Sequence, residues 1–105
     1  MSPELLEMVA ERFKALSDRA RLSLLQALRG GPLTVNELVE ATGMGQANVS
    51  RHLALLFTNG LVSRERDGVY VRYALADKDV IKLCELVCGR LENELSDRRK
   101  VIAGR

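Results

Sequence analysis

The chain has 105 residues, enough for one domain with a small hydrophobic core. Hydrophobic residues make up 47% of it and charged residues 29%, which is typical of a globular protein and excludes a disordered one. The net charge of +2 does not by itself indicate nucleic-acid binding. Because there is no apolar run that could span a bilayer and no signal peptide, we expect a soluble cytoplasmic protein with no membrane partner.

Two helices are predicted in the first thirty residues. Residues 2–4, Ser-Pro-Glu, are typical of a helix start, because they supply a cap, a proline at the first helical position and an acid at the positive end of the helix dipole. The first helix is expected over about 3–16. Asp18 is expected to cap a second helix, which the Gly-Gly-Pro of residues 30–32 ends.

A helix-turn-helix is predicted over about 34–58. Thr34 followed three residues later by Glu37 is a capping-box signature, and it opens a short helix to Thr42. Glycines at positions 43 and 45 favour a tight turn, after which a second helix begins. Two short helices joined by a glycine-containing turn are the helix-turn-helix pattern.

The second of these helices, residues 46–58, has one apolar and one polar side at a helical period. Its polar side has small or polar residues and no acid, which suits a helix that enters a DNA groove and reads base edges. This side holds Ala47, Ser50, Arg51, Ala54 and Thr58. Arg51 is the best candidate for a base or phosphate contact, because its planar fork fits guanine or phosphate.

A basic β-hairpin is predicted over about 61–75. Its residues alternate around Asp67-Gly68, a dipeptide that favours a two-residue hairpin turn. Arg64 and Arg66 share a face of the first strand, and Arg72 lies on the second. Beside a recognition helix, such a hairpin is a wing suited to phosphate or the minor groove. The alternative is an ordinary solvent-exposed hairpin.

A long last helix is predicted over about 78–97, capped by Asp77. One side of it is an apolar stripe of Val80, Cys84, Val87, Cys88, Leu91 and Leu95. A three-helix unit with a hairpin is too small to cover both this stripe and the first helix. We therefore expect a symmetric homodimer through the first and last helices. Two copies would place two recognition helices one turn apart on a pseudo-palindromic operator in double-stranded DNA.

Cys84 and Cys88 are the candidate inducer or metal site. At positions i and i+4 they face the same way, about 6 Å apart at Cβ, which is too wide for a relaxed disulfide. This spacing suits a thiophilic metal or metalloid ion, or the sensing of persulfides or oxidants. The alternative is that both are small apolar residues that fill the interface. No other cofactor is indicated.

The remaining candidate residues have structural interpretations. His52, the only histidine, is expected to pack or to contact phosphate, because no second metal ligand is near it in the sequence. Tyr70 and Tyr73 are expected to pack the hairpin and not to stack on bases. The sequence shows no Ser-His-Asp arrangement, phosphate loop or apolar carboxylate pair, so we expect no enzyme.

Five segments together resemble the ArsR (arsenical-resistance-repressor) family over about residues 10–76. They are residues 15–22 (ALSDRARL), 33–38 (LTVNEL), 46–53 (QANVSRHL) and 59–62 (NGLV), with the hairpin turn at 67–68. The resemblance implies a homodimeric winged-helix transcriptional repressor that leaves its operator when a metal, metalloid or sulfur species binds. It also implies base or phosphate contacts from Gln46, Ala47, Asn48, Ser50 and Arg51.

The chain departs from the family at its known metal sites. Arsenic-sensing members carry Cys-x-Cys before the recognition helix, where this chain has Thr34 and Asn36. Zinc- and cobalt-sensing members start the last helix with Asp-x-His and carry His or Glu later in it. Here the start is Asp-Lys-Asp at 77–79, with Arg90 and Asn93 later. We expect neither site. A repressor without a thiol switch and a winged-helix module that binds protein remain the alternatives.

Overall fold

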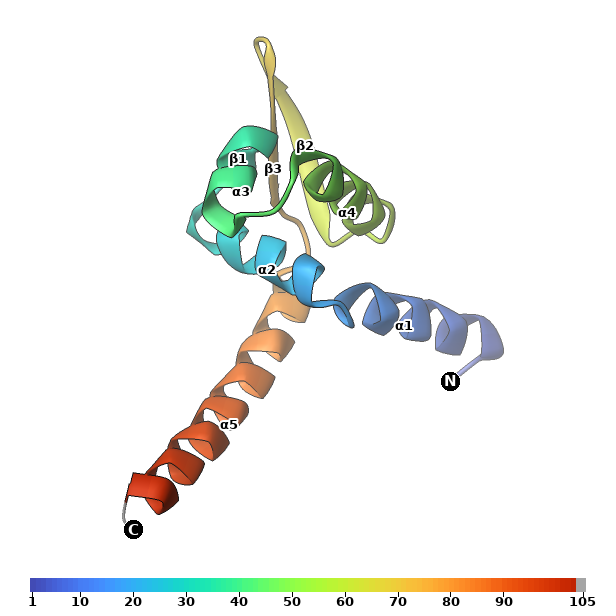
Figure 1. Ribbon diagram of the computed structural model, residues 1–105. Helices are drawn as coiled ribbons and strands as arrows, with labels where there is room; N and C mark the ends of the chain where they lie inside the picture. The colour runs from blue at the N-terminus through green and yellow to red at the C-terminus, as the bar shows by residue number, and fades with distance from the viewer. Residues whose placement is uncertain (104–105) are drawn as a thin grey trace.

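A computed structural model describes residues 1–103 and shows a mainly helical chain with a three-stranded antiparallel sheet (Figure 1). The elements in chain order are α1 (Pro3–Leu16), α2 (Arg19–Ala27), a short 3-10 helix η1 (Leu28–Gly30), β1 (Leu33–Thr34), α3 (Val35–Thr42), α4 (Gln46–Thr58), β2 (Val62–Asp67), β3 (Tyr70–Leu75) and α5 (Lys78–Ala103). This order confirms the predicted winged helix-turn-helix. No helix among the described residues is long and apolar enough to cross a membrane.

The helix caps predicted from the sequence are present. The side chains of Ser2, Asp18 and Asp77 each accept a hydrogen bond from a backbone N–H three residues ahead, at 3.0–3.1 Å. Thr34 and Glu37 form the predicted capping box. The hydrogen bond from the Arg21 N–H is the main cause that lowers the pKa of Asp18.

The core lies between α2, α3, α4 and the sheet. It consists largely of leucines with no exposed surface, among them Leu24, Leu38, Leu53 and Leu56, together with Val49. Of the two tyrosines that were expected to pack the hairpin, Tyr73 packs against this core, whereas Tyr70 is 58% exposed near the hairpin tip. The apolar side of α4 is therefore fixed inward, and its polar side faces away from the body.

The sheet adds a strand that the sequence did not predict. The strand order is β1-β3-β2, so the two-residue β1 pairs with β3 along the edge of the hairpin. Leu33 lies opposite Tyr73, and Thr34 lies opposite Arg72. The hairpin is thus joined to the residue that caps α3.

Two predicted boundaries were wrong. The hairpin loop is Gly68-Val69, not Asp67-Gly68, because Asp67 pairs with Tyr70 in the ladder. Only Gly68 takes a positive φ, of 62°, which fits a type II′ turn with glycine first. The last helix also continues beyond residue 97 to Ala103, since no glycine or proline interrupts it after Gly89.

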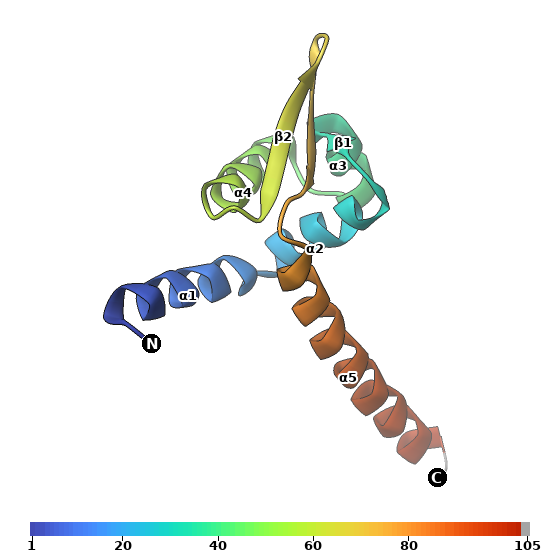
Figure 2. The same cartoon turned by 180° about the vertical axis from the view of Figure 1, so that it is seen from behind.

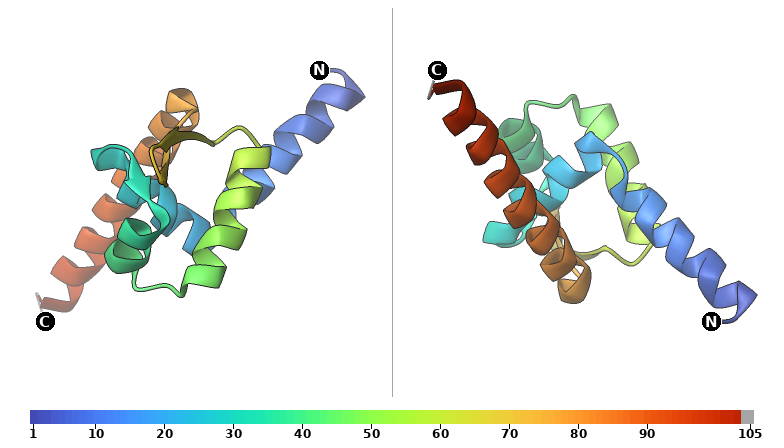
Figure 3. Two further views of the ribbon diagram at one scale, coloured as in Figure 1. Left: turned by 90° about the horizontal axis from the view of Figure 1, so that it is seen from above. Right: turned by 90° about the horizontal axis from the view of Figure 1, so that it is seen from below.

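Helices α1 and α5 extend away from the body like two arms. They diverge in views from the front and from behind (Figures 1 and 2), and they end at opposite corners when seen from above or below (Figure 3). The radius of gyration is 16.3 Å, compared with about 13 Å for a compact chain of this length. The arms carry exposed apolar residues, among them Leu6, Phe13, Val87, Leu91 and Leu95, which are 47–55% exposed.

Candidate nucleic-acid interface and thiol site

The outward face of α4 is the main candidate surface for DNA. Val49, Leu53 and Leu56 are fully buried on its inner side, as predicted. The candidate contact residues Gln46, Ala47, Asn48, Ser50 and Arg51 are all exposed. The Arg51 guanidinium donates a hydrogen bond of 3.0 Å to the side-chain oxygen of Asn48. Two of the candidate side chains are therefore held together on the exposed surface, one turn into the helix.

The N-terminus of α4 has no side-chain cap. Its cap residue is Gly45, which has no side chain to accept a hydrogen bond from the first turn. The N–H groups of that turn are consequently available to an anion such as a phosphate. The preceding turn is made at Gly43, whose φ of 74° favours glycine.

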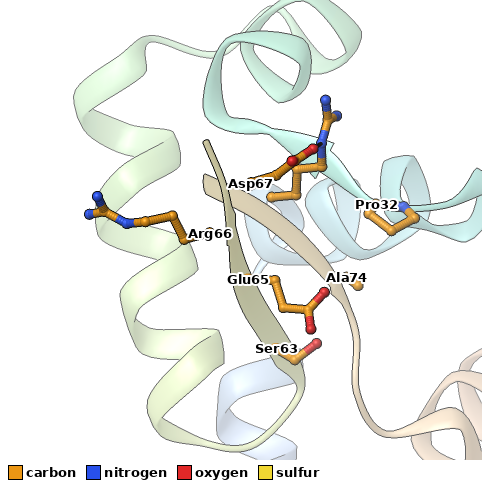
Figure 4. A pocket seen from close by; sticks show the side chains of 7 residues that line it. Pro32, Ser63, Glu65, Arg66, Asp67 and Ala74 are labelled. Atoms are coloured by element: carbon orange, nitrogen blue, oxygen red, sulfur yellow. Dashed lines mark hydrogen bonds and ion pairs between the residues drawn. The ribbon is translucent and has the colours of Figure 1, made fainter. Parts of the chain in front are cut away.

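The wing has two chemically different faces. Arg64 lies opposite Tyr73 in the ladder and Arg66 opposite Val71, so these residues share the face toward α4. The Arg64 guanidinium stacks over the Phe57 ring of α4, 4.1 Å from its centroid. Arg66 extends on the side opposite to Glu65 and Asp67 (Figure 4). The wing thus presents two arginines beside the recognition helix.

Arg72 belongs to the other face of the wing. It lies opposite Glu65 in the ladder, and its guanidinium contacts two carboxylates, Glu37 at 3.3 Å and Asp67 at 3.4 Å. Figure 4 shows the shallow hollow at this face, of about 270 Å³, which also includes Pro32, Ser63, Ala74 and Arg66, the last with its side chain directed away from Glu65 and Asp67. The strand register therefore places the Arg72 side chain on the opposite face of the wing from those of Arg64 and Arg66.

Two arginines that the sequence did not single out make contacts where α1 and α5 join the body of the domain. Arg21 donates to the backbone oxygens of Ala15 at 2.6 Å and Lys14 at 3.2 Å, at the end of α1. It also approaches the Nδ1 atom of His52 at 3.5 Å, so His52 joins α4 to this contact. No sequence pattern pairs these residues, because they lie up to 31 positions apart.

Arg12 makes the second contact of this kind. It pairs at 2.9 Å with the Oδ2 atom of Asp77, whose other oxygen caps α5. Both oxygens of this carboxylate are therefore engaged. Among the described residues no group of three or more His, Cys, Asp and Glu side chains could hold a metal ion.

Cys84 and Cys88 border an apolar groove between the arm α5 and helices α1 and α2. The groove has a volume of about 540 Å³. Its apolar lining includes Phe13, Leu16, Leu22, Leu25, Ile81, Leu83, Val87, Leu91 and Leu95. Both cysteines are free thiols, with Cys84 half-buried and Cys88 exposed. The two thiols thus lie on the arm's apolar side, where the sequence predicted an interface.

Both thiols hold their protons more firmly than an ordinary cysteine. Burial, and then the charge of Glu85, raise the pKa of Cys84. Cys88 donates a hydrogen bond of 3.5 Å to the Glu92 carboxylate, which raises its pKa through that bond and through its charge. Since the thiolate is the nucleophile, neither cysteine is activated for attack at neutral pH. Glu92 was not singled out in the sequence, although its i+4 spacing from Cys88 was the available signal.

The chain is similar to known bacterial regulators. A family model described as bacterial regulatory protein, arsR family, matches residues 18–64. The transcriptional regulator NmtR of Mycobacterium tuberculosis is 43% identical over 93 residues, covering 86% of this chain and 78% of the relative. A probable mercury resistance operon repressor of Streptomyces lividans is 44% identical over 77 residues, which cover 73% of this chain and 62% of that relative.

A solved structure extends this similarity to the fold. The homodimeric winged helix-turn-helix DNA-binding domain of Mb0332 from Mycobacterium bovis superposes with a TM-score of 0.80. It is 35% identical, and the match covers 90% of this chain and 91% of that domain. The winged helix-turn-helix architecture of this chain is therefore shared with that domain.

The Glu92 contact predicts a measurable change in the titration of Cys88. In a Cys84→Ser background, Glu92→Gln removes the carboxylate charge that favours the protonated thiol, so thiolate should form at lower pH. The ultraviolet absorbance of the thiolate, followed against pH, measures this shift. Glu94→Gln is the matched control, because Glu94 is exposed and has no contact with Cys88. Identical titrations of the Glu92→Gln protein and its parent would refute the assignment.

Proposed function

This chain belongs to the arsR family of bacterial regulatory proteins, and we propose that it is a dimeric, sequence-specific DNA-binding repressor of transcription. The observation that carries the proposal is the acid-free outer face of α4 with two arginines of the wing beside it. An exposed helix with short residues and a few donors fits the major groove, and a basic hairpin fits the adjacent backbone or minor groove.

In the proposed complex, α4 supplies the sequence-reading contacts. Its first turns would place Gln46, Ala47, Asn48, Ser50 and Arg51 against base edges and phosphates. Arg51 is held at Asn48 in the free protein, which limits the freedom that its side chain loses on binding. Arg66, and Arg64 above Phe57, would then neutralise phosphates beside the groove.

The two arms support a homodimer. Their apolar residues are about half exposed in the single chain, and the groove between α5 and the other two helices is open. An apolar surface of this extent on a soluble protein marks an interface. A second copy is the occupant whose own arms have the matching apolar surface, and the similar domain of Mb0332 is homodimeric.

The inducer that we propose is a thiophilic metal or metalloid ion bound at Cys84 and Cys88. Soft ions bind thiolates strongly enough to displace both thiol protons, even where the pKa values are raised. Persulfides and oxidants instead need a thiolate that is already present, so the protonated state of both cysteines disfavours them. One similar protein is a probable repressor of a mercury resistance operon. Ion binding in the groove would move the arms and, with them, the spacing of the two recognition helices.

Replacing Arg51 tests DNA binding. Arg51→Ala should weaken binding to DNA from upstream of the protein's own gene by about 1–3 kcal/mol, because a bidentate base or phosphate contact is lost. Affinity is measured over a series of salt concentrations. Arg90→Ala is the charge-matched control, since Arg90 is exposed on α5, and its affinity should be unchanged. A wild-type affinity that does not respond to salt would instead favour a protein-binding module.

A charged substitution on the apolar side of α5 tests whether this helix forms the dimer interface. Leu91→Glu should weaken self-association by about a hundredfold or more, because each copy would bury an unpaired carboxylate in the apolar interface. Sedimentation over a range of concentrations measures the change, and DNA affinity should fall with it. Leu86→Glu introduces the same charge on the opposite side of α5, where Leu86 is 73% exposed, and should leave the dimer intact. A wild-type protein that sediments as a monomer at working concentrations would exclude this interface.

Removing both thiols tests the inducer. Mercury(II) should release DNA from the wild-type protein near stoichiometric concentration, and the Cys84→Ser, Cys88→Ser protein should bind DNA normally but fail to respond. A fluorescent operator reports binding, and circular dichroism checks that the fold survives the ion. If the doubly substituted protein releases DNA at the same ion concentration, the cysteines are not the sensor. Release of the wild-type protein by a persulfide donor, and not by the ion, would identify reactive sulfur as the inducer.

A further inference from the structure

Three segments of the chain meet at Arg72. In the sheet this residue lies on the central strand β3, opposite Glu65 of β2 on one side and Thr34 of β1 on the other. Thr34 is also the N-terminal cap of α3, the first helix of the helix-turn-helix. Residues opposite one another in an antiparallel ladder have side chains on the same face. The Arg72 side chain therefore lies on the face where α3 begins.

Glu37 closes this junction from the side of α3. Its Oε1 atom accepts a hydrogen bond of 2.9 Å from the Thr34 N–H, and Thr34 Oγ1 accepts one of 3.2 Å from the Glu37 N–H. The same Oε1 atom lies 3.3 Å from the Arg72 Nη1 atom. These bonds to Thr34, together with the charge of Arg72, lower the pKa of Glu37, so its carboxylate is ionised at neutral pH.

Arg72 also contacts the far end of the hairpin. Its Nε atom lies 3.4 Å from the Oδ2 atom of Asp67, the last residue of β2. The guanidinium thus lies between a carboxylate of α3 and a carboxylate near the wing tip. Two of its N–H donors and much of its charge are therefore already taken up by carboxylates, whereas Arg66 on the other face has no carboxylate partner among the described residues.

We infer that Arg72 is a positioning residue that sets the angle of the wing relative to the helix-turn-helix through Glu37, and that it is not itself a DNA contact. This inference rests on the DNA-binding function proposed above. Beyond the β1–β3 pairing and the core packing of Val62 and Tyr73, the wing then has one side-chain contact on each face. Arg64 lies on Phe57 of α4, and Arg72 lies on the capping box of α3. The angle that they set decides where Arg66 meets the DNA backbone.

The experiment combines DNA affinity with a double-substitution cycle. The proteins are wild type, Arg72→Gln, Glu37→Gln and the double variant, each measured over a salt series with the operator fragment. Glutamine at position 37 keeps the capping box, so α3 retains its start. Arg66→Gln is the matched control on the other face of the wing, and Arg72→Lys tests rescue by a shorter cation.

If Arg72 positions the wing, each single substitution should weaken binding by up to about fivefold, the scale of an exposed ion pair. The double variant should be no weaker than either single one, because both remove the same contact. The slope of log affinity against log salt should stay near the wild-type value, and Arg72→Lys should restore part of the affinity. Arg66→Gln should instead reduce the slope by about 0.9, the value for one lost phosphate contact.

The opposite pattern would overturn the inference. If Arg72 contacts phosphate, Arg72→Gln should reduce the salt slope as Arg66→Gln does, and Glu37→Gln should strengthen binding by releasing the arginine. Amide hydrogen exchange in the free protein gives a readout without DNA: both single variants should speed exchange where β1 meets β3, and Arg66→Gln should not. If amide exchange at the β1–β3 pairing is unchanged in both single variants, the positioning role of Arg72 is also refuted. A wild-type protein that binds no DNA would refute the proposed function alone, and the exchange data would still decide the role of Arg72 in the wing.

Discussion

The burial of one side of α4 is the constraint on which the rest of the structure depends. Val49, Leu53 and Leu56 have no exposed surface, and they pack with Leu24 and Leu38 of the two preceding helices. Truncating such a leucine typically costs about 2–5 kcal/mol, so the rotation of α4 about its axis is strongly fixed. The outer face is then determined without any further interaction, because at 3.6 residues per turn it is the complement of the buried one. Binding specificity on this helix is therefore free to vary while the core stays the same.

Because the core is small, the apolar surfaces of the two arms, α1 and α5, stay largely exposed in the single chain. Its fully buried residues come from α2, η1, α3, α4 and the start of the wing, and among the arms only the last two residues of α1 join them. Arg21 and Arg12 fix the roots of α1 and α5 through polar contacts with backbone oxygens and Asp77. These contacts define where the arms begin but cover little apolar area. Association with a second copy, as proposed, would bury the remaining apolar surface. His52 of α4 contacts Arg21, which donates to a backbone oxygen at the end of α1, so α4 lies directly beside the start of this arm.

Local sequence signals predicted the local structure well. The caps at Ser2, Asp18, Thr34 and Asp77 were predictable because each depends on residues within three or four positions. The hairpin was predicted with its loop one residue early, since both Asp-Gly and a glycine-first pair satisfy a two-residue turn and only the ladder decides between them. The strand β1 and the Glu37–Arg72 contact could not be predicted, because both join segments more than thirty positions apart. For the candidate site, the exposed face of α4 followed from periodicity, whereas the separation of Arg72 from Arg64 and Arg66 required the strand register.

The proposal of a soft ion as inducer depends on the chemical environment of the two thiols and not on their spacing. A helix places Cys84 and Cys88 on one side of α5, and this spacing is equally compatible with an ion, a persulfide or simple packing. The neighbouring acids remove that ambiguity in part, because Glu85 and Glu92 both favour the protonated thiol. A nucleophilic sensor would be better served by a dominant basic neighbour, which lowers the pKa of a cysteine. Arg29 acts in that direction on Cys88, but Glu92 is the larger influence and the pKa is raised. An ion that binds sulfur strongly needs no such activation, since its own charge drives the protons off. Under the proposed function, Glu92 would also favour a cation beside the thiols, whereas the charge of Glu85 is paired with Arg29 at 3.0 Å.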